Sequence, residues 1–158
     1  MSRILVAYFS AGGVTEKAAK ESAADIGADV YAIRPAEPYT AEDLNYMNAK
    51  SRSSVEMGDP SSRPALADKD AKIEDYDVIY VGYPIWWGVA PHVVNSFLEA
   101  YDFTGKTIIP FATSGGSPIG DAKAYLGVSA PGAVFKEGKR IGGVKELDAL
   151  KIWMEGMV

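Results

Sequence analysis

The residues best suited to chemistry in this sequence are the hydroxyls and glycines of Ser10-Ala11-Gly12-Gly13-Val14-Thr15. An apolar run, Ile4 to Phe9, precedes them, and small side chains at helical spacing follow as far as Ile26. A buried strand that leads through such a turn into a helix directs the free amides of the first helical turn toward a ligand. Because the helix dipole also favours negative charge there, the pattern predicts a phosphate-binding loop.

Two later loops are also free of Lys and Arg, and each follows an apolar run. Pro84-Ile85-Trp86-Trp87-Gly88 follows the run from Asp77 to Tyr83, and residues 113–120 follow the run from Thr107 to Ala112. Ligands of open parallel sheets bind outside the carboxyl ends of the strands, where the strand order reverses. Phosphate held by neutral donors, aromatic planes and a polar backbone rim together indicate a nucleotide with a large flat ring.

The elements that must position these loops alternate between strands and helices. The expected strands are residues 4–9, 29–34, 77–83, 107–112 and 133–135. The expected helices are residues 14–26, 41 to about 50, one that begins near 91, 121–126, and a last helix from about 144. The buried candidates of the last helix are Leu147, Leu150, Ile152 and Trp153. The alternation predicts an α/β fold with a parallel sheet covered on both faces, and we expect one domain over residues 1–158.

Residues 35 to 75 are polar and punctuated by proline. Thr40 with Asp43 resembles a capping box that would open the helix over residues 41–50. The stretch from 51 to 64 is expected to be a long loop. We interpret most of the segment as an elaborated crossover between two strands, and the alternative is a flap over the ligand. Arg52 and Arg63 are the candidates for charged side chains that face a partner.

Composition excludes several classes of function. The formal net charge of −5 argues against a nucleic-acid partner, and no apolar run approaches the roughly 20 residues of a spanning helix. No signal peptide is recognisable at the N-terminus, so a cytoplasmic protein is expected. The absence of cysteine excludes disulfides and thiol chemistry, and a single His92 argues against a histidine metal site. His92 is expected at the surface or as a capping residue, not as a proton donor. Any electrons must therefore be carried by a bound organic cofactor.

The first loop narrows the choice of nucleotide. It is not Gly-x-Gly-x-x-Gly, so the dinucleotide fingerprint is absent, and it lacks the terminal Gly-Lys-Ser/Thr of a Walker A loop. Flavin mononucleotide (FMN) fits better, with its single phosphate in the first loop and its isoalloxazine ring between the other two. A glycine pair is usually only a turn, and a tryptophan pair is usually core or interface. Because these tryptophans lie at a strand end directly before a glycine, we interpret them as cofactor contacts instead.

In these loops the chain resembles the flavodoxin family, specifically bacterial flavodoxin-like proteins with a Pro-Ile-Trp-Trp-Gly loop. The family's phosphate loop, Thr/Ser-x-Thr-Gly-x-Thr, corresponds to residues 10–15, and Gly12 replaces a hydroxyl residue. The resemblance extends from Ile4 to about Arg140 and includes residues 59–64 and 113–115. It implies a flavodoxin-like three-layer sandwich, with a five-stranded parallel sheet in the order 2-1-3-4-5, helices on both faces, and FMN at the carboxyl ends of the strands.

The resemblance also implies which residues contact the cofactor. The phosphate is expected at Ser10, Gly12, Gly13, Val14 and Thr15. The ring is expected beside Pro84, Ile85, Trp86, Trp87 and Gly88. Trp87 is preferred over Trp86 for stacking because it directly precedes the glycine. The pyrimidine edge is expected to meet backbone groups of Thr113, Ser114, Gly115, Gly116, Ser117 and Gly120. No metal ligand and no catalytic side chain is predicted.

The predicted function is electron transfer through FMN, and the alternative is an FMN-dependent NAD(P)H oxidoreductase of the quinone reductase type. Partners would be redox proteins or a small-molecule electron acceptor, with no nucleic acid or membrane, and the chain would be a monomer or weak dimer. Because the loops lack cations, anionic reduced flavin should be poorly stabilised, which predicts low potentials. The resemblance further suggests that Gly88 allows a backbone flip beside the reduced ring.

Particular residues argue against two alternative functional classes. A phosphate-accepting receiver domain would share the sheet order but needs an Asp at the carboxyl end of its central strand, where this chain has Tyr83-Pro84. A serine hydrolase would need a Gly-x-Ser-x-Gly motif, and neither Ser10 nor Ser114 lies in one.

Overall fold

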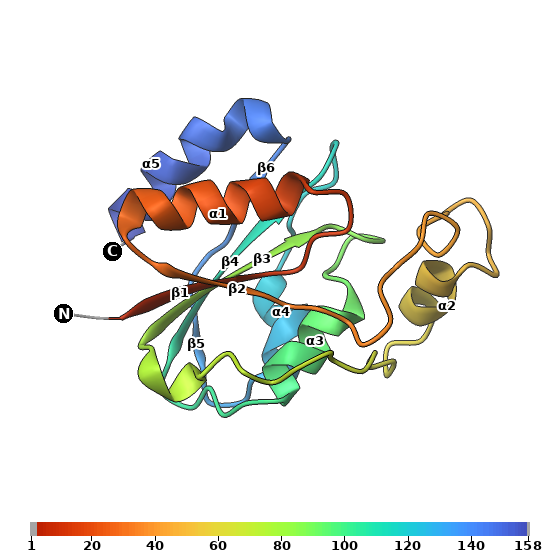
Figure 1. The fold of residues 1–158 in the computed structure, drawn as a ribbon, viewed down its shortest axis with the longest axis horizontal. Coiled ribbons are helices and arrows are strands. Elements are labelled where there is room, and N and C mark those ends of the chain that lie inside the picture. The colour runs from red at the N-terminus through yellow and green to blue at the C-terminus, as the bar shows by residue number, and fades with distance from the viewer. Residues whose placement is uncertain (1–2, 158) are drawn as a thin grey trace.

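The computed structural model describes residues 3–157, in which a parallel β-sheet lies between two layers of helices (Figure 1). The sheet order is β2-β1-β3-β4-β5, and β6 also pairs with β4. All pairings between the strands are parallel. The strands are β1 (Ile4–Tyr8), β2 (Asp29–Ala32), β3 (Val78–Pro84), β4 (Thr107–Thr113), β5 (Val134–Phe135) and β6 (Lys139–Ile141). The predicted fold class and sheet order are confirmed.

Helices cover both faces of this sheet. The α-helices are α1 (Val14–Ile26), α2 (Arg52–Gly58), α3 (His92–Glu99), α4 (Ala122–Leu126) and α5 (Leu147–Met157). Short 3-10 helices span Ile73–Asp75, Gly127–Ser129 and Val144–Glu146. Helices α1 and α5 lie on one face, α3 and α4 lie on the other, and α2 lies beyond the carboxyl ends of the strands (Figure 1). No helix within residues 3–157 combines the length and the apolar character that crossing a membrane requires.

Each strand supplies side chains to both hydrophobic layers, because successive residues point to opposite faces. In β1, Val6 and Tyr8 join the layer packed against α1 and α5. Leu5 and Ala7 join the layer packed against α3 and α4. This double burial explains why the central strands are continuous apolar runs in the sequence.

The fifth strand position is divided into β5 and β6, and Pro110 in β4 explains the break. The Lys136 amide donates to the Ile108 carbonyl (2.9 Å), so this edge of β4 next presents Pro110, which has no N–H. The neighbouring chain passes this point at Gly138, where a Cβ would lie only 2.7 Å from the Pro110 carbonyl oxygen. Pairing resumes in β6, which the sequence analysis missed.

The helix predicted over residues 41–50 is wrong. Thr40 and Asp43 do form both hydrogen bonds of a capping box: the Thr40 amide donates to Asp43 Oδ2 (2.9 Å), and the Asp43 amide donates to Thr40 Oγ1 (3.1 Å). The residues that follow form turns instead of a helix. Asn45 and Asn48 explain this, because each side chain accepts a hydrogen bond from the amide two residues later, at 3.1 and 2.9 Å.

Helix α2 forms instead within the segment expected to be a loop. Its N-cap is Ser51, whose hydroxyl oxygen accepts a hydrogen bond from the Ser54 amide (3.4 Å). In the last helix, burial of Leu147 and Leu150 is confirmed, and Trp153 is partly buried. The expected burial of Ile152 is wrong, since it is 69% exposed and lies on the outer face of α5.

Candidate functional site

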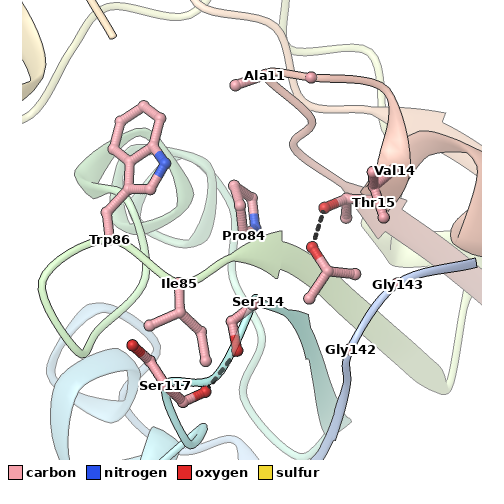
Figure 2. A pocket seen from close by; sticks show the side chains of 13 residues that line it. Ala11, Val14, Thr15, Pro84, Ile85, Trp86, Ser114, Ser117, Gly142 and Gly143 are labelled. Carbon is pink, nitrogen blue, oxygen red and sulfur yellow. Dashed lines mark hydrogen bonds between the residues drawn. The ribbon is translucent and has the colours of Figure 1, made fainter. Parts of the chain in front are cut away.

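The three predicted loops meet at the carboxyl ends of β1, β3 and β4 and line a pocket of about 410 Å³ (Figure 2). This volume lies within the roughly 300–1,000 Å³ typical of small-molecule sites. None of the described residues that line it is ionisable. The lining consists of Ala11, Gly12, Val14, Thr15, Pro84, Ile85, Trp86, Thr113, Ser114, Gly115, Ser117, Gly142 and Gly143. The sequence therefore predicted three of the four segments that form this pocket.

The first loop leaves the N-terminus of α1 open toward the pocket. Gly13, the residue before the helix, has a φ of 93°, and no side chain of the described residues caps the helix. The Ser10 hydroxyl accepts a hydrogen bond from the Gly13 amide (3.0 Å) and so holds the turn closed. The amides of the first helical turn have no intrahelical partner, so this end of α1 can receive an anion.

A buried pair of hydroxyls joins the first loop to the third. Thr15 Oγ1 lies 2.8 Å from Thr113 Oγ1, and both side chains line the pocket. Within the pair one hydroxyl donates, and the other keeps its own proton to donate elsewhere. The pair thus ties the start of α1 to the end of β4 and leaves one donor for a ligand.

The second loop is a tight turn that places its two tryptophans differently. The backbones of Trp86 and Val89 exchange two hydrogen bonds (2.9 and 3.1 Å) around Trp87 and Gly88, whose φ angles are 50° and 80°. Positive φ at both central residues is the signature of a type I′ turn. Trp86 forms the pocket wall, whereas Trp87 is 53% exposed and lies outside the lining. The choice of Trp87 as the stacking ring stays a prediction, and the wall position belongs to Trp86.

Trp86 is held by other aromatic rings. Its ring packs edge-on against Phe9 at 5.6 Å and against Tyr39 at 5.3 Å between centroids. The Arg52 guanidinium lies over the Tyr39 ring at 3.9 Å and pairs with Glu56 at 2.9 Å. Burial and a hydrogen bond to Glu56 raise the pKa of the Tyr39 hydroxyl. These contacts attach α2 to the pocket and engage Arg52 within the fold. A partner-facing role for Arg52 stays a prediction.

The third loop is held by a cation that the sequence analysis missed. Arg140 in β6 donates from Nε to Ser114 Oγ (2.9 Å) and from its terminal nitrogen to the Ser114 carbonyl (2.8 Å). The Ser114 hydroxyl in turn donates to the Ser117 carbonyl (2.5 Å). The three loops themselves contain no Lys or Arg, and Arg140 contacts the third loop from outside the pocket lining. Arg140 belongs to the unpredicted strand β6, and the expectation that no cation lies beside the flavin ring stays a prediction.

Two glycines of the pocket wall were also missed. Gly142 and Gly143 directly follow β6, and the Gly142 amide donates to Glu146 Oε2 (2.8 Å). A glycine pair after an apolar Ile141 was a usable signal, had the strand before it been recognised.

Conversely, six predicted residues lie outside the lining: Ser10, Gly13, Trp87, Gly88, Gly116 and Gly120.

Of the two positions expected for His92, at the surface or as a capping residue, the surface position is wrong. His92 is 8% exposed, and its Nδ1 lies 2.6 Å from Ser62 Oγ. Because the Ser62 hydroxyl donates to the Glu56 carbonyl (2.7 Å), the geometry assigns Nδ1 as the donor toward Ser62. Burial is the main cause that lowers the pKa of His92, so the ring is neutral near pH 7. It does not line the pocket.

The other predicted partner-facing charge is also used internally. Arg63 Nε donates to Glu99 Oε2 (2.8 Å), and the Ser129 hydroxyl donates to the same oxygen (2.7 Å).

Among residues 3–157 no group of three or more His, Cys, Asp or Glu side chains could hold a metal ion.

Comparison with known proteins gives three findings. The family model described as flavodoxin matches residues 3–157. The chain is similar to proposed flavoproteins from Bacteroides uniformis (47% identity, TM-score 0.91, 98% of each chain) and Bacteroides eggerthii (47% identity, TM-score 0.90, 99% of this chain and 98% of that one). A flavoprotein in complex with FMN from Lactobacillus acidophilus has the same fold (18% identity, TM-score 0.71, 95% of this chain and 99% of that one).

No curated protein matched the chain. The family model nevertheless covers almost the entire sequence, and the sheet order agrees with it. The chain belongs to the flavodoxin family.

Proposed function

We propose that this chain binds FMN in the pocket formed by the three loops and transfers electrons through it. The observation that carries the proposal is the open, uncapped N-terminus of α1 at one side of an uncharged pocket, with the flat Trp86 ring at the other (Figure 2). Membership of the flavodoxin family supports it, as does the FMN complex of the Lactobacillus relative.

The residues of the pocket fit FMN group by group. The first-turn amides of α1 and the hydroxyl pair of Thr15 and Thr113 would hold the phosphate. A Cβ built at Gly12 meets nothing within 4 Å, so this part of the loop has room beside it. The isoalloxazine ring would lie beside Pro84 and Trp86, and the third loop would meet its polar edge.

When bound, FMN supplies one- and two-electron redox chemistry. The protein's part is to bind, orient and shield it. Trp86, Ile85 and Pro84 give the pocket an apolar side that excludes water from one wall. Arg140 keeps the third loop in place through Ser114 and brings positive charge close to the pocket.

A second candidate is an FMN-dependent NAD(P)H oxidoreductase, and one observation favours it. A cavity of about 280 Å³ adjoins the proposed FMN pocket and shares Ile85 and Trp86 with it. Such a cavity offers space for a small acceptor beside the flavin. An NADH:FMN oxidoreductase has the same fold, although at 16% identity and a TM-score of 0.54 this likeness concerns the fold alone.

Two assays test these proposals. Purified protein mixed with FMN should show a shifted flavin absorption spectrum that persists through gel filtration, and free FMN that elutes separately would refute the binding. The FMN-loaded protein is then mixed with NADH or NADPH and a quinone. Inertness unless a separate reductase is added supports the carrier, whereas steady oxidation of the nicotinamide supports the enzyme.

A further inference from the structure

A separate cavity of about 330 Å³ is lined by residues of α2, α3 and α4 and of the loops that join them. It shares no lining residue with the proposed FMN pocket or with the cavity that adjoins that pocket. Its volume falls at the lower end of the range for small-molecule sites. Most of its walls are apolar: Met57, Pro60, Val89, Ala90 and Val128. Such walls suit a ligand with one or two rings, because methionine and proline pack well on aromatic surfaces.

Two residues of α3, His92 and Asn95, give this cavity a polar side. They are 8% and 4% exposed, and their spacing of three residues places them next to each other on one face of the helix. Asn95 Nδ2 donates to the Tyr125 carbonyl (3.1 Å) and to Ser129 Oγ (2.9 Å). The carbonyl contact identifies the other terminal atom as Oδ1, and no group within residues 3–157 donates to it.

His92 Nε2 is a second acceptor without a partner. Nδ1 donates to Ser62 Oγ (2.6 Å), so Nε2 of the neutral ring carries a lone pair. Burial lowers the pKa of His92, which keeps the ring neutral at pH 7. No hydrogen bond joins Nε2 to any of the described residues.

Both acceptors can be reached from the cavity. Among the described residues, the side-chain polar atoms that are both fully enclosed and without a partner are the hydroxyls of Ser22 and Ser53. Asn95 Oδ1 and His92 Nε2 also lack a partner but are not enclosed, so each keeps accessible surface. Because both residues are more than nine-tenths buried and line this cavity, that surface faces it.

The other polar groups of the lining indicate the charge of the ligand. The Tyr125 hydroxyl donates to the Ile119 carbonyl (2.8 Å). Arg63 donates to Glu99 Oε2 (2.8 Å) and to the Ser62 carbonyl (2.7 Å). No carboxylate of the described chain lines the cavity, whereas the Arg63 cation does, so a cationic donor is disfavoured. A neutral hydroxyl on an aromatic ring supplies the missing donor and matches the apolar walls.

We propose that this cavity binds a small neutral phenol whose hydroxyl donates a hydrogen bond to His92 Nε2, with Asn95 Oδ1 available to a second hydroxyl. The site is independent of FMN and goes beyond the proposed function. It assigns to α2 and the loop after it a ligand-binding role in addition to the crossover between β2 and β3.

The single histidine of the chain allows a direct test. Protein labelled with nitrogen-15 in histidine gives ring signals from His92 alone. The Nε2 resonance should move upfield when 2-naphthol is added, because a ring nitrogen that accepts a hydrogen bond becomes more shielded. The matched probe 2-fluoronaphthalene has the same fused rings without a donor and should leave the resonance in place. An unchanged Nε2 resonance at saturating 2-naphthol would overturn the inference.

Affinities measured by equilibrium dialysis test the same hydrogen bond. His92→Phe removes the acceptor, while Ser62 keeps its hydrogen bond to the Glu56 carbonyl. This variant should bind 2-naphthol about 3- to 10-fold more weakly than the wild type and should bind 2-fluoronaphthalene unchanged. Unaltered binding of 2-naphthol would contradict the proposal. Equal losses for both probes would also contradict it, because the ring would then only fill space.

A pair of matched variants tests the location of the site. Val128 lines the cavity and is 73% exposed, and Val134 in β5 is 51% exposed and lies outside the lining. Val128→Ala should weaken both probes alike by about 2- to 4-fold through lost apolar contact, and Val134→Ala should weaken neither. Equal affinities of both probes for Val128→Ala and Val134→Ala would overturn the assignment to this cavity. The same results are expected with and without bound FMN, so failure of FMN binding does not affect this test.

Discussion

Two adjacent glycines of the first loop have opposite tolerance to substitution. Gly12 lies outside the left-handed region, and a Cβ there meets nothing within 4 Å, so a side chain fits. Gly12→Thr should bind FMN at least as tightly as the wild type, because it restores a hydroxyl near the proposed phosphate. Titration by flavin fluorescence measures this, and clearly weaker binding would contradict the role assigned to the loop. Gly13→Ala is the contrasting variant: with a φ of 93° it should lose about 1–2 kcal/mol of unfolding free energy in urea.

Arg140 should influence the flavin potential, because a cation near the ring stabilises the anionic reduced form. Arg140→Gln should lower the two-electron midpoint potential of the FMN-loaded protein by about 20 mV, equivalent to roughly 1 kcal/mol for a partly screened charge. Arg140→Lys keeps the charge and should retain more of the wild-type potential, while losing the two-point contact with Ser114. Identical potentials for the wild type and Arg140→Gln would show that this charge does not reach the flavin.

Stability below neutral pH should depend on His92. Its pKa is lowered in the folded protein, mainly by burial and then by Arg63, whereas Glu56 and Asp59 act in the opposite direction. The unfolded chain therefore takes up a proton near pH 6.5 that the folded chain does not bind. Unfolding free energy should fall as pH decreases from about 7 to 5, and the fall should be less steep in His92→Gln. Equally steep profiles from urea unfolding would contradict this assignment.

At the scale of elements, β3 and β4 pack closely because Gly82 has no side chain. A Cβ at Gly82 would lie 2.2 Å from Cζ of the buried Phe111 ring. Gly82→Ala should destabilise the protein by about 1–3 kcal/mol through overpacking, and Phe111→Leu in the same chain should recover part of that loss.

Gly58→Ala is a matched control for this substitution. Gly58 is the last residue of α2, and a Cβ there meets nothing within 4 Å. This variant should change the unfolding free energy by less than about 1 kcal/mol. If urea unfolding gave equal losses for Gly82→Ala and Gly58→Ala, close packing against Phe111 would not explain the role of Gly82.

Elements with strong periodicity could be predicted from the sequence, and weaker ones could not. The buried strand β3 and helix α1 follow directly from apolar runs and small-residue spacing, and α1 was predicted to the residue. The absence of a helix over residues 41–50 could not be predicted, because Asn45 and Asn48 divert the chain from the helix that Thr40 and Asp43 would open. The short β6 depends on pairing with β4 and has little sequence signal of its own.

The same division applies to the candidate site. Its loops could be predicted because each follows an apolar strand and contains hydroxyls, glycines or tryptophans. The choice between Trp86 and Trp87 at the pocket wall depends on the turn that the chain makes after Ile85, which the loop composition does not specify. Arg140 contacts Ser114 across 26 residues of sequence, so this contact could not be predicted from local residue spacing.

At the scale of the whole molecule, the strand order brings the separate loops together. Parallel strands place all their carboxyl ends on one edge, and the first helix begins at that edge. The chain thus combines an uncapped helix N-terminus, an aromatic wall and a polar loop around one pocket, although these segments are spread over about a hundred residues of sequence. The chain belongs to the flavodoxin family, and binding of FMN in this pocket is the central proposal.

Titration of the purified protein with FMN and with riboflavin, followed by flavin fluorescence, tests this proposal most directly. Riboflavin has the same ring but lacks the phosphate. We expect saturable binding of one FMN per chain, with riboflavin about 10- to 100-fold weaker because charge-assisted hydrogen bonds from the start of α1 are lost. Equal affinity for the two ligands, or no saturable binding of FMN, would contradict it.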